Sequence, residues 1–259
     1  MTAPAPDRAE QGTHKGYPYG PALACVSDYW VQQTVPSGET RCAVHGVEHT
    51  ARTATSIVVD LALHQVTGQD RYWERAQQRA RRVVARLVRD PEHGAWVFAP
   101  GRLDPYNCSN NVIDSGECAR CLGALLLYAG DRLDAALREL VVEVLYRNAT
   151  TYLADAVVTK EVTNQRLWGA MGLATAARAL GETAWFAAVR MSIDRSLAEQ
   201  NADGSFPYHP EPERFGLHPG AADVSVYYQA RVLTYLWHTL AMLGEGAGTV
   251  RRPTLAALR

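Results

Sequence analysis

The chain carries one motif twice, about 110 residues apart, and this repeat constrains the fold more than any other feature. The two copies are His93-Gly94-Ala95-Trp96-Val97-Phe98-Ala99-Pro100 and Asp203-Gly204-Ser205-Phe206-Pro207-Tyr208-His209-Pro210. Each follows an amphipathic segment and has the form Gly-x-aromatic-x-aromatic-x-Pro. A repeat at such long spacing indicates that similar supersecondary units are stacked along the chain. It also directs attention to the segments that follow each copy.

The apolar pattern predicts helices almost throughout, and strand patterns are limited to residues 96–98 and 206–208. The expected helices cover residues 46–67, 69–89, 112–129, 131–153, 163–180, 182–200 and 223–243. Some of them are amphipathic, whereas residues 118–130 and 224–243 carry a single charge each. A helix that is apolar on every side is enclosed by other helices. The alternation predicts an all-α fold, a single α/α toroid of about four hairpins with an inner and an outer ring.

Composition places the chain among ordinary globular proteins, with 47% hydrophobic and 20% charged residues in a length of 259. A net charge of −1 gives no electrostatic footprint for nucleic acid or an anionic membrane. Residues 1–20 lack an apolar signal segment, so we expect a disordered tail, a domain at 21–245 and a second tail at 246–259. Five cysteines, an odd number, suit reduced thiols and a cytoplasmic location.

The turn Gln200-Asn201-Ala202-Asp203-Gly204-Ser205-Phe206 resembles the Q-x-x-D-G-S-W/F turn of terpenoid cyclases and protein prenyltransferases. The same turn, followed by a stretch such as Asp223–Tyr228 that opens an inner helix, also occurs in α/α-toroid glycoside hydrolases, polysaccharide lyases and uronate epimerases. The resemblance covers about residues 46–243. It implies the toroid fold and leaves the reaction open, because toroids host many unrelated chemistries.

Each predicted inner helix begins with a polar stretch. In a toroid the N-terminal ends of these helices converge at one end of the cavity, where their dipoles favour anionic groups. Spacings of three and four residues put several of these polar residues on one helix face. The candidate site residues are Arg41, His45, His49, Asn110, Asn111, Asp114, Glu117, Asn164, Gln165, Trp168, Asp223, Tyr227, Tyr228 and Arg231. Polar sets on otherwise apolar helices predict a pocket.

Structural roles compete with this interpretation. Asp223, Asn164 and one of Asn110 or Asp114 could each cap a helix, because their oxygens accept hydrogen bonds from free backbone N–H groups. Capping does not explain Arg231, which is the single charge on its helix. An unpaired buried charge is costly, so Arg231 needs either an acidic partner, such as Asp114 or Glu117, or an anionic ligand.

We expect neither a metal nor a cofactor. Residues 111–118 loosely resemble the Asp-Gly-Cys zinc-ligand segment of protein prenyltransferase β subunits. However, Cys118 is displaced from that spacing, and Tyr227 and Tyr228 occupy the stretch where that family has its histidine. The remaining combinations, which make no recognised zinc signature, are Cys42/His45/His49 and Cys118/Cys121. Phosphate loops, nucleophile elbows and Asp-rich magnesium motifs are absent.

The remaining chemistry is cofactor-independent acid–base catalysis on a small-molecule or glycan substrate. Aromatic residues suit stacking on sugar faces, and amides suit recognition of hydroxyl groups. In a glycoside hydrolase, Asp114 and Asp223, or Glu117, would flank the glycosidic bond as acid and base.

A uronate lyase or epimerase would use a different set. His45 or His49 would be the base and Tyr227 the acid, while Asn110 and Arg231 bound the substrate carboxylate. Two other functions stay open: a cyclase or isomerase of natural-product biosynthesis, and a non-catalytic toroid that binds a glycan or a protein. The sequence leaves the oligomeric state open.

Overall fold

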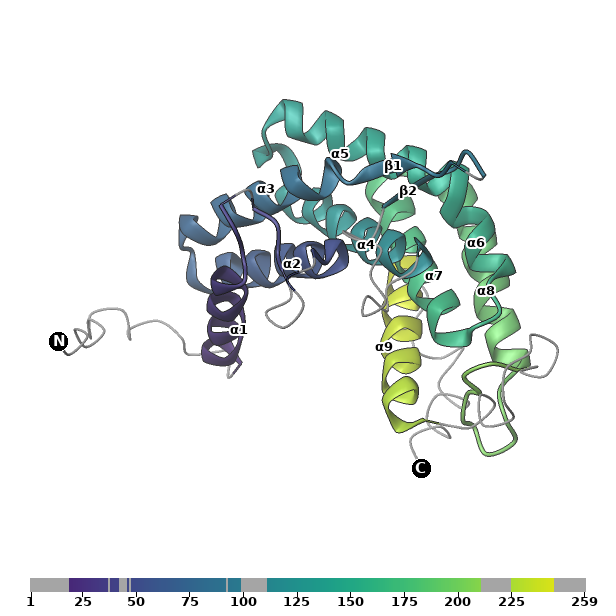
Figure 1. Ribbon diagram of the computed structural model, residues 1–259. Coiled ribbons are helices and arrows are strands. Elements are labelled where there is room, and N and C mark those ends of the chain that lie inside the picture. The colour runs from purple at the N-terminus through teal and green to yellow at the C-terminus, as the bar shows by residue number, and fades with distance from the viewer. Residues whose placement is uncertain are drawn as a thin grey trace.

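The computed structural model describes residues 19–36, 38–41, 46, 48–91, 93–98, 111–210 and 225–244, and most of them are helical. The α-helices are α1 (Gly20–Gln32), α2 (Thr50–Thr67), α3 (Asp70–Val84), α4 (Asn111–Ala129), α5 (Ala135–Asn148), α6 (Ala154–Thr159), α7 (Thr163–Leu180), α8 (Phe186–Ala198) and α9 (Val226–Leu243). Figure 1 shows them as an open arch, with α1 to α3 in one arm and α6 to α9 in the other.

The arch has two layers. Helices α2, α4, α7 and α9 follow one another along the inner row, and each packs on the next. Helices α3, α5 and α8 form the outer row, and each packs on the inner helix that precedes it in the chain. Gly68 and Gly181, with φ of 68° and 74°, end α2 and α7 in the left-handed conformation. The all-α toroid with inner and outer helices is therefore confirmed.

Contacts between neighbouring inner helices show that these helices run parallel. The start of α2 meets the start of α4, since the Ala51 N–H donates to Asp114. Near the far ends of the same two helices, His64 hydrogen-bonds Tyr128. Helices α7 and α9 show the same order, because Trp168 meets Arg231 and, toward both C-termini, Thr175 meets His238. All four N-terminal ends therefore lie at the same end of the arch.

Helices α4 and α7 touch through their backbones. A Cβ atom added to Gly172 of α7 would lie 2.1 Å from the carbonyl oxygen of Gly116 in α4, far inside any tolerated contact. A Cβ atom on Gly116 would lie 2.8 Å from the Trp168 carbonyl oxygen. Gly116 on α4 and Gly172 on α7 thus permit a backbone approach that no residue with a side chain would allow. This contact sets the register between the two inner helices.

The repeated motif is structural in both copies. Gly94, in the turn between β1 and β2, and Gly204, in the turn after α8, both have positive φ. In the first copy, the backbone N–H of Phe98 donates to Ser115 of α4. In the second, Gln229 of α9 hydrogen-bonds both the N–H and the carbonyl of Phe206. Each copy therefore fastens its aromatic segment to the next inner helix.

Several elements differ from the sequence prediction. Helix α1 was not predicted, and its Gly20 lies within the expected tail. The expected helix 69–89 ends at Val84, and Leu87–Arg89 forms strand β1, which pairs antiparallel with β2, Trp96–Phe98. Residues 206–208 form no strand, because Gln229 takes the hydrogen bonds of Phe206.

Other predicted helices also have different bounds, and the one expected at 182–200 is α8, Phe186–Ala198, preceded by a 3-10 turn. The helix expected at 131–153 begins at Ala135 and passes through a π-helical turn, Ala149–Leu153, into α6. Helices α2 and α9 begin later than expected, at Thr50 and Val226. Residues 1–18 and 245–259 lie outside the described residues, as does nearly all of both expected tails.

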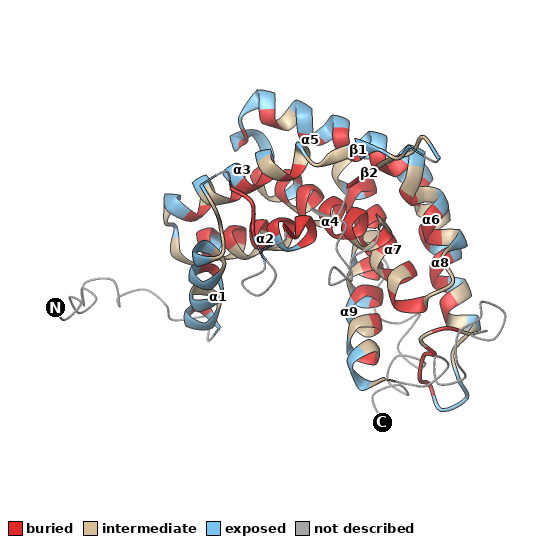
Figure 2. Ribbon diagram, viewed as in Figure 1, coloured by how far each residue is buried: buried red, intermediate tan, exposed pale blue. Residues whose placement is uncertain are grey.

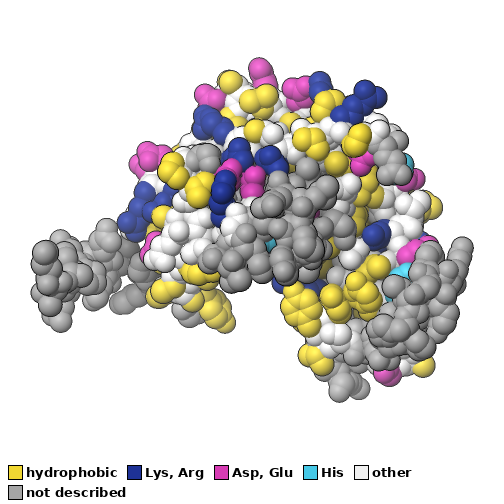
Figure 3. Space-filling view, in the orientation of Figure 1, with side chains coloured by type: hydrophobic (Ala, Val, Ile, Leu, Met, Phe, Trp, Pro, Cys, Tyr) yellow, Lys and Arg dark blue, Asp and Glu magenta, His cyan; other side chains and the backbone are white. Residues whose placement is uncertain are grey.

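Burial follows the two layers. Figure 2 shows buried residues concentrated along α4 and α7, in the middle of the arch. Helix α9 was expected to be enclosed, but as the last helix of the row it exposes Val226, Tyr227 and Trp237. The open row leaves a hollow between the two arms, which the space-filling view shows (Figure 3). The inner helices line this hollow.

The helix contact at Gly172 predicts a large loss of stability when a methyl group is added. We expect Gly172→Ala to lower the free energy of unfolding by about 3 kcal/mol or more, because neither backbone can yield locally. Gly68→Ala is the control: it has a positive φ and open space, and should cost about 1 kcal/mol. Urea denaturation measures both, and equal losses would contradict the backbone contact.

Candidate functional site

Glu117 of α4 lies where side chains from three inner helices meet. Its carboxylate accepts two hydrogen bonds from the Arg120 guanidinium, at 2.5 and 3.1 Å. It also accepts one from Thr55 of α2 at 2.6 Å, and one from the indole Nε1 of Trp168 in α7 at 2.8 Å. Glu117 is 4% exposed, whereas its three partners are partly exposed. The carboxylate therefore holds a cation and an aromatic ring at the inner surface.

These contacts decide the charge of Glu117. Burial acts to raise the pKa of its carboxyl group, but the Arg120 guanidinium and the hydrogen bonds from Thr55 and Trp168 outweigh burial, so the pKa lies below its ordinary value. Glu117 is thus ionised at neutral pH. This state suits a residue that positions its neighbours or stabilises a positive charge, and it disfavours proton donation.

Arg231 of α9 is surrounded by aromatic rings. Its guanidinium carbon lies 5.1 Å from the ring centroid of Tyr227 and 5.6 Å from that of Trp168. Its Nη1 donates to the Tyr235 hydroxyl at 3.3 Å, and the Tyr235 ring stacks on Trp168 with centroids 5.0 Å apart. Aromatic faces attract a cation but leave its outward N–H groups available for an anion.

The acidic partner expected for Arg231 does not occur in the described part of the chain. Glu117 pairs with Arg120 instead. The Asp114 side chain, from α4, is hydrogen-bonded to the first turn of α2. Within residues 19–210 and 225–244, apart from their short undescribed gaps, no ion pair to Arg231 is seen. Asp114 and Glu117, the two partners predicted for Arg231, are therefore engaged elsewhere.

A tyrosine cluster extends the aromatic surface away from Arg231. The Tyr227 and Tyr228 rings meet edge to face, with centroids 5.3 Å apart, and Tyr228 lies 4.7 Å from the ring of Tyr208 in the second motif copy. Burial, followed by the neighbouring Tyr228, raises the pKa of Tyr208, and a hydrogen bond with Gln165 acts against this. Tyr227 is 60% exposed, so the cluster leads from solvent to Arg231.

Asp114 occupies a structural position. It is fully buried, and its Oδ1 accepts a hydrogen bond from the Ala51 N–H at 3.3 Å, in the first turn of α2. His49, the residue before that turn, makes no capping bond with its own side chain. Asp114 therefore caps the neighbouring inner helix, so the capping role predicted for it applies to α2 instead of its own helix α4.

The other predicted residues fall into three groups. Asn111, at the start of α4, hydrogen-bonds Asp90, and Asn164, at the start of α7, is buried with its amide oxygen unbonded among the described residues. Arg41 pairs with Glu39, in a network that joins the segment before α2 to α3, rather than with the aromatic cluster. The residues outside the described ranges are His45, Asn110 and Asp223.

Sequence reasoning missed three residues of this cluster: Arg120, Tyr235 and His238. All three lie deeper along the helices than the polar N-terminal stretches that drew attention. A signal existed on α9, because Tyr227, Arg231, Tyr235 and His238 recur at spacings of four, four and three on one helix face. Arg120 lies in the cluster because it forms an ion pair with Glu117, and this ion pair was not predicted.

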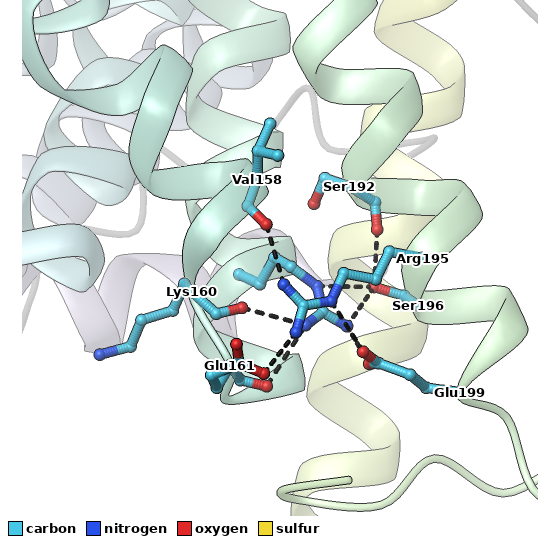
Figure 4. A network of polar contacts seen from close by, with 8 residues as sticks. Val158, Lys160, Glu161, Ser192, Arg195, Ser196 and Glu199 are labelled. Carbon is cyan, nitrogen blue, oxygen red and sulfur yellow. Dashed lines mark hydrogen bonds and ion pairs between the residues drawn. The ribbon is translucent and has the colours of Figure 1, made fainter. Parts of the chain in front are cut away.

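The start of α7 is fixed by a buried ionic network behind it (Figure 4). Arg166 is fully buried and bonds Ser196 of α8 and, in an ion pair, Glu199. Arg195 pairs with Glu199 and Glu161. The backbone carbonyls that accept from these two arginines are those of Val158, Lys160 and Glu161. The network anchors the turn between α6 and α7 to the outer layer, and so places Trp168.

Metal-binding and membrane-spanning features were sought in the described residues. There, His, Cys, Asp and Glu nowhere gather in a group of three or more that could hold a metal ion. Cys118 and Cys121 are buried core residues, and burial raises the pKa of both thiols. None of the described helices is long and apolar enough to cross a bilayer.

Comparisons with known proteins identify the fold. No protein-family model and no curated protein matches the chain. Among solved structures, it is similar to a crystal structure of a possible member of GH105 family from Salmonella enterica subsp. enterica serovar Paratyphi A str. ATCC 9150, with a TM-score of 0.60 and 14% identity. The match covers 87% of this chain and 66% of that one, so this chain spans less than two thirds of that protein's length. The likeness shows a shared α/α-toroid fold.

The environment of Glu117 predicts a pH-dependent contribution to stability. Its lowered pKa means that the stabilisation is complete above the unfolded pKa and is lost as pH falls through the folded value. We expect Glu117→Gln to cost about 3 kcal/mol at neutral pH, because Arg120 loses its partner while largely buried. The difference from wild type should shrink in acid.

Denaturation at neutral and acidic pH measures this difference. The matched control is Glu143→Gln, which removes the half-exposed pair with Arg147 and should cost no more than about 1 kcal/mol. A Glu117 variant as stable as the Glu143 variant would contradict the assigned role.

Proposed function

We propose that the protein is a cofactor-independent acid–base enzyme that acts on a uronate-containing carbohydrate in the hollow of the toroid. The observation that carries this proposal is Arg231, a half-buried cation held between Tyr227 and Trp168 with no described carboxylate beside it. A uronate offers a carboxylate to the guanidinium and a sugar face to the rings.

The surroundings of Arg231 support an anionic substrate. Glu117 neutralises Arg120, so the positive charge of Arg231 remains in excess among the described residues of this cluster. The inner helices are parallel, and their N-terminal ends add positive potential at the same end of the arch. The GH105 description of the structural neighbour is consistent with a carbohydrate substrate.

Hydrolysis is the reaction that we favour, with elimination or epimerisation as the alternative from the same site. For hydrolysis we propose Asp223 as the acid, because Asp114 is fully buried as a cap of α2. For elimination the proposed pair is His45 or His49 with Tyr227. The ionised state of Glu117 makes it a positioning residue in either reaction, because it orients Arg120 and Trp168. Asn164 and Gln165, at the start of α7, are proposed to bind sugar hydroxyl groups, with Asn110, Asn111, Tyr228 and Arg41 as further proposed contacts.

Turnover tests the class of reaction. An aryl β-D-glucuronide and uronate-containing oligosaccharides should be cleaved, whereas the matched aryl β-D-glucoside, which lacks the carboxylate, should react far more slowly. Hydrolysis yields a saturated sugar, and elimination yields a conjugated unsaturated uronate that absorbs in the ultraviolet. Equal rates on the uronide and the glucoside would refute a uronate substrate.

Replacement of Arg231 tests the anion site directly. We expect Arg231→Met to weaken binding of D-glucuronate by about tenfold or more, because a charge-assisted hydrogen bond is lost. The control is Arg178→Met: this arginine also lies beside an aromatic ring and contacts α9, at the opposite end of α7. Calorimetric titration with D-glucuronate, and with D-glucose as the neutral match, measures the change; unchanged binding in the Arg231 variant would exclude the assignment.

A further inference from the structure

We propose that His238 is the general base of this site, acting through its Nδ1 atom; the inference rests on the proposed function. His238 lies on the same face of α9 as Arg231 and Tyr235, one to two turns further along the helix. It is partly exposed, although Tyr235 between them is buried. The ring is therefore accessible and close enough to the inner cluster for the charges of Arg120 and Glu117 to act on it.

The hydrogen bonds of Thr175 favour one tautomer of this histidine. The Thr175 hydroxyl donates its single hydrogen to the Met171 carbonyl at 2.8 Å. We therefore assign the Thr175 oxygen, 3.0 Å from the His238 Nε2 atom, as the acceptor of an Nε2–H hydrogen. The neutral ring consequently carries its proton on Nε2 and an acceptor lone pair on Nδ1. Among the described residues, no hydrogen bond to Nδ1 is seen.

The charges around His238 keep it neutral. Burial, followed by the Arg120 guanidinium, lowers the pKa of the imidazole, and Glu117 opposes them. Further polar and titratable groups that face this region are Cys121 on α4, Trp168 and Thr175 on α7, and Arg231 and Tyr235 on α9. A ring with this environment is unprotonated at neutral pH and can accept a proton during the reaction.

Two turns of α9 separate Arg231 from His238. The two residues are seven positions apart, an axial rise of about 10 Å between their backbone positions. In the proposed complex, a uronate whose carboxylate is bound by Arg231 extends along α9 toward His238.

The proton balance of hydrolysis is then complete. Nδ1 takes a proton from water as the water oxygen bonds to the anomeric carbon and the glycosidic C–O bond breaks. The leaving oxygen takes a proton from the carboxylic acid of the proposed hydrolase, and the carboxylate that remains regains a proton from solvent. The histidinium returns its proton to solvent after the products leave.

The decisive variant is His238→Gln, because the glutamine amide can still donate to Thr175 but has no basic atom at the Nδ1 position. We expect uronide turnover to fall by about 100-fold or more, while D-glucuronate binding and the thermal midpoint stay close to wild type. Wild-type turnover should rise with pH through the His238 pKa, and the residual turnover of the variant should lack this limb. The control, Thr175→Val, removes the hydrogen bond but keeps the base, and should retain turnover within about tenfold.

NMR of the ring nitrogens, with the His238→Gln spectrum for assignment, reads the tautomer independently of turnover. An Nδ1–H tautomer in the wild-type protein overturns the proposal. An active wild type with an equally active His238→Gln variant also overturns it and leaves the proposed function standing. A wild type that is inert on every uronide overturns the proposed function and the role of His238 together.

Discussion

The backbone contact between α4 and α7 is the constraint on which the rest of the structure depends. Gly116 and Gly172 bring the two helices closer than any side chain would permit, and both helices sit in the middle of the inner row. Helix α2 packs on one side of this pair and α9 on the other, so the contact joins the two arms of the arch. The same approach lets the Trp168 indole reach the Glu117 carboxylate, because the two side chains project from adjacent turns of the touching backbones. Packing and site geometry therefore have one common cause.

The distribution of buried charge separates scaffold from site. In the outer network, Arg166 and Arg195 share Glu199, and Arg195 also pairs with Glu161, so both arginines have a carboxylate partner. In the inner cluster, Glu117 satisfies Arg120, whereas the contacts of Arg231 within the described part of the chain are with the side chains of Trp168, Tyr227 and Tyr235. Buried charges that are all paired with one another serve to hold the structure together. A half-buried cation without a carboxylate partner can instead bind an anionic ligand. The contrast between the two networks is the physical reason for placing the substrate at α9.

The sequence patterns predicted the helical layers well because burial dictates them. Residues 163–180 were predicted with the observed bounds, since an apolar helix with a glycine at its end has few alternatives. The toroid also followed from the repeated turn. The sequence singled out the site residues that lie in the first two turns of the inner helices, such as Trp168 and Arg231. Arg120 and His238 were missed because they lie one to three turns beyond the polar helix starts, although Arg120 is three residues from Glu117 and His238 shares one face of α9 with Arg231. The expected pairing of Arg231 with Glu117 failed because Arg120, three residues away on the same helix, was the nearer cation.

The order of side chains along α9 explains how one helix can combine recognition with chemistry. Tyr227, at the exposed end, and Arg231, one turn further, present a ring and a charge to an arriving ligand. Tyr235 is buried, and burial raises the pKa of its hydroxyl group, so it stays protonated and can hydrogen-bond without adding negative charge beside Arg231. His238, beyond it, is deprived of its proton by burial and by Arg120. The groups that attract an anion thus lie nearest the start of the helix, and the group suited to accept a proton lies further along it. This gradient requires the parallel arrangement of the inner helices, because only then do the charged residues of α4 and the titratable residue of α9 meet at the same depth.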